Sequence, residues 1–130
     1  MSKIPQELKY TKEHEWVKVT ESDPIVTIGI TEYAAENLGD IVFIELPEPG
    51  SNVDQFGKLG EVESVKAVSD IYSPISGTVV EANSQLTDNP EHINDSPYDN
   101  GWIAKIQIAN STELDNLMNS KEYDTMLTEE

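Results

Sequence analysis

The stretch EVESVKAVSDIYSPISGTVVE, residues 61–81, decides the fold because it reads as two strands with a lysine between them. Residues 61–68 and 71–81 are rich in Val and Ile, and the link between them is short enough for a hairpin. Lys66 is a lone cation here, since no other basic residue occurs between positions 58 and 105. A tight hairpin would hold its ε-amine clear of the surface, where another enzyme could reach it.

Two glycines frame this lysine. Gly50 lies sixteen residues before Lys66, and Gly77 lies eleven residues after it. A compact double hairpin needs turns with φ values that are open mainly to glycine. We therefore expect positive φ at both glycines and a position for Lys66 near the middle of one folded unit.

Further strands and one helix are expected before the hairpin. The expected strands cover residues 15–20, 26–30, 40–46 and a short piece around Val53. Ser22-Asp23-Pro24 supplies turn chemistry, so the first two strands should form a hairpin. Residues 40–46 contain four apolar residues in succession, which predicts a central strand covered on both faces. Thr31 should cap a helix over residues 32–38, and Gly39 should end it.

The C-terminal part is expected to contain a long loop, a last strand and an interrupted helix. Residues 83–101 are rich in Asn, Asp, Pro and Ser, which predicts a long surface loop with a helical turn near Pro90. Residues 102–108 alternate as a last strand. Ser111 or Thr112 should then cap a helix that is interrupted at Asn119-Ser120 before it resumes. Many short strands with frequent turns favour an all-β sandwich or barrel with peripheral helices.

Length and charge limit the function. A chain of 130 residues allows one domain, and 25 acidic residues against 8 lysines give a net charge of -17. Such a chain repels phosphate backbones and anionic lipids, so we expect neither nucleic acid nor membrane as a partner. No stretch reads as a secretory signal or a spanning helix, which favours the cytoplasm. The acidity indicates either simple solubility or a partner with a basic docking face.

Patterns typical of catalysis or metal binding are missing from the sequence. His14 and His92 lack metal-ligand spacing, no Gly-rich phosphate loop precedes a helix, and no Ser lies in a nucleophile elbow. The chain contains no cysteine, so it has no thiol of its own. We expect no catalytic residue and no metal site, and any sulfur chemistry would have to come from an attached group.

The motifs around the lysine resemble those of a known family. Gly50, Glu63-Ser64-Val65-Lys66-Ala67 and Gly77 resemble the lipoylation motif of lipoyl-type domains. Longer blocks narrow the resemblance to the H proteins of the glycine cleavage system: YTKEHEWV (10–17), IGIT (28–31), GDIVFIELP (39–47), EVESVKA (61–67), SPISG (73–77) and GW (101–102). The His14–Val17 block and the C-terminal helix are absent from ordinary lipoyl domains. The resemblance extends from about Leu8 to Leu127.

This resemblance implies a fold and a carrier function. The fold would be an all-β-dominated barrel-sandwich hybrid of the lipoyl/biotinyl type, with a short internal helix and C-terminal helices. Residues 1–130 would form a single lipoyl-carrier domain with a lead over 1–8 and a helical segment over 111–128. Lys66 would bear lipoic acid in amide linkage. The chain would be a monomeric, non-catalytic carrier.

The family also implies a set of partner enzymes. Its members take an aminomethyl group from a pyridoxal-phosphate glycine decarboxylase and present it to a tetrahydrofolate-dependent aminomethyltransferase. Dihydrolipoyl dehydrogenase then reoxidises the dithiol. A lipoate-attaching enzyme would modify Lys66, and Glu63, three residues before the lysine, is a candidate for recognition by that enzyme.

The loaded arm of the family rests in a cleft near the first strand. A carboxylate there would hold the cationic amine, and the candidates by motif position are Glu15 and Asp70. Glu13 stands where relatives often carry Ser, and Asn37 where some carry His, so the lining can differ here. His14 either lines the cleft or packs under Trp16.

Two other functions stay open on the sequence. A biotinyl carrier would share the double hairpin, but it normally flanks its lysine with Met on both sides, whereas Val65 and Ala67 stand here. An unmodified acidic interaction module would carry no group on Lys66 at all. The mass added to Lys66 distinguishes these alternatives.

Overall fold

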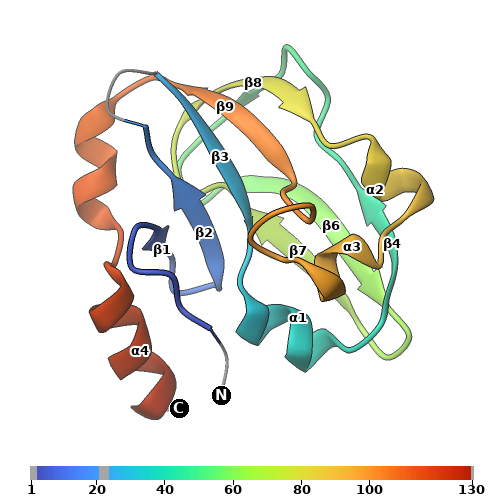
Figure 1. Ribbon diagram of the computed structural model, residues 1–130. Helices are drawn as coiled ribbons and strands as arrows, with labels where there is room; N and C mark the ends of the chain where they lie inside the picture. The colour runs from blue at the N-terminus through green and yellow to red at the C-terminus, as the bar shows by residue number, and fades with distance from the viewer. Residues whose placement is uncertain (1–2, 21–23, 130) are drawn as a thin grey trace.

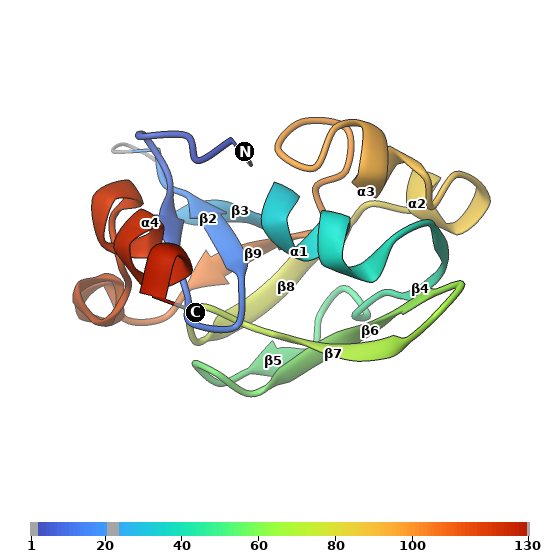
Figure 2. The same ribbon diagram turned by 90° about the horizontal axis from the view of Figure 1, so that it is seen from below.

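Two antiparallel β-sheets lie face to face in this protein, as two views of the computed structural model show (Figures 1 and 2). The structure describes residues 3–20 and 24–129. Ser22 and Asp23 of the expected turn therefore lie outside the described residues. The helices lie at the ends and edges of the sheets and do not alternate with the strands. The predicted all-β-dominated class, a barrel-sandwich hybrid, is confirmed.

The larger sheet has the strand order β1-β2-β3-β9-β8-β5. The expected hairpin between β2 and β3 is confirmed, with Trp16 opposite Gly29 and Val17 opposite Ile28. A Cβ atom at Gly29 would lie 2.7 Å from the Trp16 ring, so the indole occupies the space that any larger residue would need. The strands of this sheet are β1 Lys9–Tyr10, β2 Glu15–Lys18, β3 Ile25–Ile30, β5 Asn52–Val53, β8 Gly77–Ala82 and β9 Ala104–Ile108.

The smaller sheet has the order β4-β6-β7, with β4 Ile41–Glu45, β6 Lys58–Ser64 and β7 Val68–Tyr72. The prediction of a central, doubly covered strand at β4 was wrong. β4 is an edge strand, and Val42 and Phe43 are 48% and 53% exposed. A β-bulge between Ile41 and Phe43 breaks the alternation of side chains, so a run of apolar residues does not require two covered faces.

The turn of the β6–β7 hairpin lies at Val65 and Lys66, earlier than the sequence suggested. Residues 69–70, the expected link, belong to β7 instead. The apolar residues around the lysine read as strand, but side-chain hydrogen bonds of Ser64 close the chain there. The hairpin itself is confirmed, and it projects at the lower right of Figure 1.

Glycine is required at positions 50 and 77, on either side of Lys66, for different structural reasons. Gly50 has φ +92°, as expected. The expectation of positive φ at Gly77 was wrong, because only Gly39 and Gly50 among the described glycines have it. Gly77 is required by a close approach of backbones instead: a Cβ atom there would lie 2.1 Å from the carbonyl oxygen of Gln107 on the neighbouring strand.

The helix that connects β3 of the larger sheet to β4 of the smaller one begins and ends where the sequence predicts. α1 covers Glu32–Leu38, and the Thr31 hydroxyl accepts a hydrogen bond from the backbone N–H of Ala34 at 3.2 Å. Gly39 ends the helix with φ +80°, and its N–H donates to the Ala35 carbonyl. The expected loop contains two single-turn helices around Pro90, α2 Gln85–Asp88 and α3 His92–Asp95.

The C-terminal segment begins with the 3₁₀-helix η1, Ser111–Asn116. Its cap is Asn110, which accepts from the N–H of Thr112, so the prediction of Ser111 or Thr112 as the cap was wrong. The expected interruption at Asn119 is confirmed. There Asn119 and Glu122 exchange side-chain-to-backbone hydrogen bonds, a capping box that starts α4, Ser120–Glu129.

The main hydrophobic core lies between the two sheets. It joins side chains such as Ile28 and Ile106 of the larger sheet to Val62 and Ile71 of the smaller one, all buried. Each such side chain contributes about 1.5–3 kcal/mol by leaving water. A second cluster packs on the other face of the first strands and holds α4 against them. Its buried residues are Leu8, Tyr10, Trp16 and Tyr123. The two clusters hold both sheets in fixed positions around the β6–β7 hairpin.

Candidate functional site

Lys66 occupies the tip of the β6–β7 hairpin, and its side chain is exposed, as the hairpin prediction required. Within the described part of the chain, Lys66 takes part in no ion pair. Its amine is therefore available to another protein. The Cε atom of Lys66 lies 3.6 Å from the point where a Cβ atom of Gly39 would be, so the stem of the side chain lies beside the end of α1.

Ser64 stabilises the turn through hydrogen bonds of its side chain and backbone. Its Oγ atom accepts hydrogen bonds from the backbone N–H groups of Lys66 at 3.3 Å and Ala67 at 3.1 Å. Its own N–H donates to the Ala67 carbonyl at 2.8 Å. Neither Val65 nor Lys66 has a positive φ, so this two-residue turn needs no glycine. Ser is a favoured first residue of such turns because its hydroxyl can satisfy their N–H groups.

The loop after α1 supports the turn from the side. The N–H of Val65 donates to the carbonyl oxygen of Asp40 at 3.1 Å. Asp40 precedes β4, and the side chain of Asn94 on α3 fixes that junction by bonding both Gly39 and Ile41. The turn is thus bonded to Asp40, in the junction before β4 that Asn94 of α3 holds.

Glu63 is exposed beside the turn. The registers place Phe43, Glu63 and Val68 in one row across the smaller sheet. Phe43 and Val68 are 53% and 60% exposed, so the carboxylate lies between two exposed apolar side chains. The structure therefore places Glu63 together with Lys66 at one end of the hairpin.

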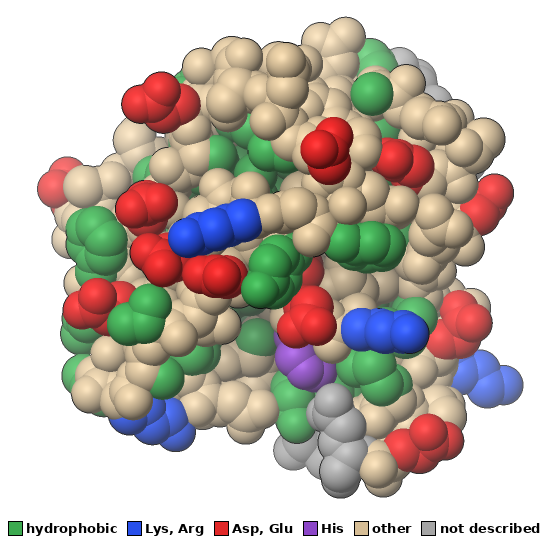
Figure 3. Space-filling model, turned by 180° about the vertical axis from the view of Figure 1, so that it is seen from behind, with side chains coloured by type: hydrophobic (Ala, Val, Ile, Leu, Met, Phe, Trp, Pro, Cys, Tyr) green, Lys and Arg blue, Asp and Glu red, His purple; other side chains and the backbone are tan. Residues whose placement is uncertain are grey.

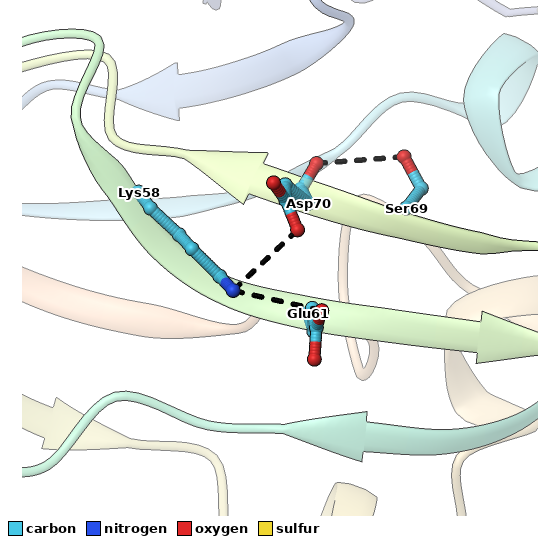
Figure 4. A network of polar contacts seen from close by, with 4 residues as sticks. All are labelled: Lys58, Glu61, Ser69 and Asp70. Carbon is cyan, nitrogen blue, oxygen red and sulfur yellow. Dashed lines mark hydrogen bonds and ion pairs between the residues drawn. The ribbon is translucent and has the colours of Figure 1, made fainter.

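Asp70 lies on the outer face of β7, in a row with Glu61 and Glu45. Lys58 bridges two of the three carboxylates: its Nζ atom is 3.5 Å from Glu61 Oε1 and 3.5 Å from Asp70 Oδ1 (Figure 4). Asp70, and then Glu61, raise the pKa of Lys58 by favouring its charged form. Acidic side chains outnumber basic ones on the side of the molecule in Figure 3, with hydrophobic side chains among them. No sequence motif marks Lys58, and residue spacing alone does not show its cross-strand contact with Asp70.

Glu15 is buried, with 2% of its surface exposed. Its Oε1 atom accepts a hydrogen bond of 2.6 Å from the Thr11 hydroxyl, and its Oε2 atom accepts one of 3.2 Å from the N–H of Tyr72. Burial raises its pKa to about 7, although these hydrogen bonds pull in the opposite direction. The carboxyl group can therefore gain or lose a proton near neutral pH.

An open pocket of about 460 Å³ lies next to Glu15. Thr11 and Tyr72, the two hydrogen-bond partners of Glu15, line it, whereas Glu15 itself lies behind them. The full lining is Tyr10, Thr11, Lys12, Glu13, Phe56, Tyr72, Asn116 and Met118. The pocket thus combines aromatic and thioether surface with a titratable carboxyl group behind one wall.

β7 connects the lysine to this pocket. Val68, Asp70 and Tyr72 alternate along it, so they share the outer face of the strand. At about 3.3 Å per residue, the path from Lys66 to Asp70 is about 13 Å and the path to Tyr72 about 20 Å. The sequence candidates therefore lie in order along one strand: Lys66 at the tip, Asp70 midway, and Glu15 bound to the far end.

His14 packs on Tyr123, in the cluster that also contains Trp16. Its Nδ1 atom lies 2.8 Å from the Tyr123 hydroxyl, and its ring packs beside Tyr33 and Tyr123. It does not line the pocket. The indole of Trp16 instead donates to the carbonyl of Pro97 and lies beside Tyr98.

Among residues 3–20 and 24–129, no group of three His, Cys, Asp or Glu side chains could hold a metal ion. In the same part of the chain, the structure has no helix with the length and apolar character needed to span a bilayer.

Comparisons with known proteins agree with the motifs. The family model described as "Glycine cleavage H-protein" matches residues 8–130. The chain is 52% identical to the glycine cleavage system H protein of Staphylococcus carnosus over 126 residues, 97% of this chain and 98% of the relative. It is 52% identical to that of Halalkalibacterium halodurans over all 130 residues, 100% of both chains. The crystal structure of a glycine cleavage system H protein from Mycobacterium marinum superposes with a TM-score of 0.86, at 38% identity, covering 96% of this chain and 99% of that one.

Proposed function

Since the chain belongs to the glycine cleavage H-protein family, we propose that it is the lipoyl carrier of a glycine cleavage system, with lipoic acid attached to Nζ of Lys66. The observation that carries this assignment is the exposed amine at the tip of a tethered two-residue turn. An attaching enzyme can reach such an amine without unfolding the hairpin. Glu63 lies beside it and is the side chain that this enzyme would read.

The residues present fit a lipoyl group. When bound, the group supplies the disulfide that accepts an aminomethyl group and is afterwards reoxidised. The chain contains no cysteine, so no protein thiol competes with it. An extended backbone advances about 3.5 Å over three bonds, so the roughly twelve bonds from Cα of Lys66 to a lipoyl sulfur would reach about 14 Å. That length spans β7 as far as Asp70. An amine carried on the outer sulfur, about four bonds further, would reach about 19 Å, close to the Tyr72 side of the pocket.

The pocket beside Glu15 is the proposed resting place of the loaded arm. A cationic amine near the wall formed by Thr11 and Tyr72 would favour the ionised form of Glu15. Asp70 lies on the way, paired with Lys58 in an exposed contact that another cation can replace. In this arrangement the chain's own residues tether, orient and shield the arm, and none of them is proposed to act as a catalyst.

The partners proposed for this carrier act on the arm in turn. They are the pyridoxal-phosphate glycine decarboxylase, the tetrahydrofolate-dependent aminomethyltransferase, dihydrolipoyl dehydrogenase and the lipoate-attaching enzyme. A flexible arm raises the effective concentration of its sulfur atoms at whichever enzyme has docked. A monomeric carrier in the cytoplasm is the simplest arrangement, and both properties stay predictions from the sequence.

Mass spectrometry after treatment with a lipoate ligase, lipoate and ATP tests the attachment. We expect one lipoyl amide on the wild-type chain, located at Lys66 by peptide mapping. Lys66→Arg should remain unmodified and should not support glycine cleavage, with an unchanged melting temperature. Lys58→Arg is the matched control on the same hairpin and should be modified normally.

Other masses would contradict the proposal. A biotinyl amide formed with a biotin ligase in place of the lipoyl group would indicate a biotinyl carrier. No added mass on Lys66 under any of these conditions would indicate an unmodified interaction module. Glu63→Gln should slow lipoylation without changing its site, and an unchanged rate would remove Glu63 from the recognition surface.

A further inference from the structure

The junction between α1 and β4 lies beside the lysine turn. The carbonyl oxygen of Asp40 in this junction accepts a hydrogen bond of 3.1 Å from the N–H of Val65. The stem of Lys66 lies beside Gly39, with its Cε atom 3.6 Å from the place that a Cβ atom of Gly39 would take. The junction therefore supports both the backbone of the turn and the stem of the lysine.

Asn94 of α3 holds this junction on both sides of Asp40. Its Nδ2 atom donates to the carbonyl oxygen of Gly39 at 2.8 Å, and its Oδ1 atom accepts from the N–H of Ile41 at 2.9 Å. A single side-chain amide thus bridges the two residues that flank Asp40.

One peptide group connects Asn94 to the turn. The carbonyl of Asp40 and the N–H of Ile41 belong to the same planar trans peptide group, so they point in opposite directions. Asn94 binds the N–H end of this group, and the N–H of Val65 binds its carbonyl end. An acceptor at the N–H end also polarises the group, which strengthens the hydrogen bond at the carbonyl end. The direction in which the Asp40 carbonyl points therefore depends on Asn94.

Residues 83–101 bring Asn94 to this place. The buried side chain of Ile93 anchors α3 in the main core, and α3 lies beside α1 (Figure 2). Gly101 allows the backbones to approach, since a Cβ atom there would lie 2.8 Å from the carbonyl oxygen of His92 and 2.9 Å from Cα of Ile93. The segment that the sequence predicts as a surface loop thus places one amide against the α1–β4 junction.

We propose that Asn94 is a positioning residue for Lys66, which fixes the turn through the Asp40–Ile41 peptide group and so directs the amine toward the lipoate-attaching enzyme. The inference rests on the proposed function, because its effect on modification requires lipoate to be attached to Lys66. Transfer to an amine requires close alignment of the reacting atoms, and a displacement of about 1 Å can lower a rate about 100-fold. A looser turn should therefore slow the transfer step more than it weakens docking.

The test compares Asn94→Ala with Asn83→Ala. Asn83 is the matched control, because it is buried in the same segment and its Nδ2 atom also bridges two backbone groups, the carbonyls of Asn100 and Trp102. Neither of these carbonyls belongs to the α1–β4 junction. Each variant loses two hydrogen bonds, so a general loss of stability should lower both melting temperatures.

Amide hydrogen exchange of the unmodified protein reports on the turn without any lipoate. Well below the melting temperatures, the N–H of Val65 should exchange about tenfold faster in Asn94→Ala and at the wild-type rate in Asn83→Ala. Asn94→Asp keeps an acceptor for the N–H of Ile41 but loses the donor to Gly39. If the peptide group carries the effect, exchange at Val65 in Asn94→Asp should stay close to that of the wild type.

The rate of lipoylation with a lipoate ligase, lipoate and ATP gives the second readout. We expect kcat to fall about three- to tenfold in Asn94→Ala and KM to change less than about twofold, because the surface around Glu63 stays intact while the amine is misplaced. Asn83→Ala should retain the wild-type values of both constants.

The outcomes distinguish this inference from the proposed function. Absence of lipoate on Lys66 of the wild-type chain would overturn both. Normal lipoylation of the wild type, with unchanged Val65 exchange and unchanged kcat in Asn94→Ala, would overturn the inference alone. Equal effects of Asn94→Ala and Asn83→Ala on exchange and kcat would also overturn it, because Asn94 would then serve only the stability of its segment.

Discussion

The carboxyl group of Glu15 accepts a hydrogen bond of 3.2 Å from the backbone N–H of Tyr72, and this contact joins the two sheets. Glu15 belongs to β2 of the larger sheet, and Tyr72 is the last residue of β7 in the smaller one. The strand that starts at the Lys66 turn is therefore fixed at its other end by a buried, titratable group. Changes at Glu15 should affect both stability and the pocket.

Stability should depend on pH through Glu15. Its pKa is about 7 in the folded protein and 4.5 in the absence of perturbation. Between these values the unfolded chain loses the proton while the folded protein keeps it, so unfolding becomes more favourable as pH rises. The shift corresponds to roughly 3 kcal/mol, lost between about pH 4.5 and 7. Urea titrations of the wild type and Glu15→Gln at several pH values measure it.

The Glu15→Gln variant supplies the comparison. Its amide oxygen can accept from the Tyr72 N–H, so that contact is retained, whereas its NH2 group faces a Thr11 hydroxyl that already accepts from the N–H groups of Glu13 and Glu15. We expect the variant to gain stability relative to the wild type as pH rises from 5 to 8. A stability difference that does not change over this range would mean that Glu15 titrates at an ordinary carboxyl pKa.

Ser64→Ala should loosen the turn that presents Lys66. The substitution removes an acceptor shared by the N–H groups of Lys66 and Ala67, and Ser64 is buried. Loss of such hydrogen bonds costs about 1–2 kcal/mol. Amide hydrogen exchange at Lys66 and Ala67 should accelerate, and lipoylation should slow. Unchanged exchange at both amides would show that the backbone alone sets the turn.

Gly77→Ala and Gly50→Ala should differ sharply in how much they lower the free energy of unfolding. Gly77→Ala brings a methyl group to 2.1 Å from the Gln107 carbonyl oxygen, so β8 and β9 must separate. We expect a loss of about 3 kcal/mol or more in the free energy of unfolding. Gly50→Ala meets no atom within 4 Å and suffers only from φ +92°, a cost of about 1–2 kcal/mol. Urea denaturation compares them, and equal costs would contradict the close approach at Gly77.

The Lys58 contacts should contribute little to stability. Lys58 is exposed and bridges Glu61 and Asp70 at 3.5 Å each, and salt screens such exposed pairs. We expect Lys58→Met to leave the melting temperature unchanged at low and at high salt. A clear, salt-sensitive fall would show instead that the lysine is needed to keep the row of carboxylates together.

Local sequence patterns predicted much of the fold because they act over short distances. The limits of α1 followed from Thr31 and Gly39, which satisfy backbone groups within one turn of the helix. The β2–β3 hairpin followed from alternating apolar residues. The edge position of β4 did not, because a bulge and strand order depend on pairing partners that lie far apart in the sequence.

Like the fold, the candidate site could be predicted only in part from the sequence. The position of Lys66 at a hairpin tip could be read from its motif. The pocket could not, since it joins residues from the first strand, the β5–β6 loop and the C-terminal segment. Nothing in the spacing of Glu15 and Tyr72 indicates their contact. Phe56 has φ +64°, and the sequence does not indicate this, because the glycine beside it suggests an ordinary turn.

The bond from Val65 to Asp40 gives the turn a stationary origin. This bond opposes displacement of the turn toward a visiting enzyme, so a group on Lys66 searches its surroundings mainly by rotation about side-chain bonds. The volume that the arm on Lys66 can reach is then the same for every partner enzyme. Each of them must bring its reacting atoms within that volume, which limits how deep its access channel can be.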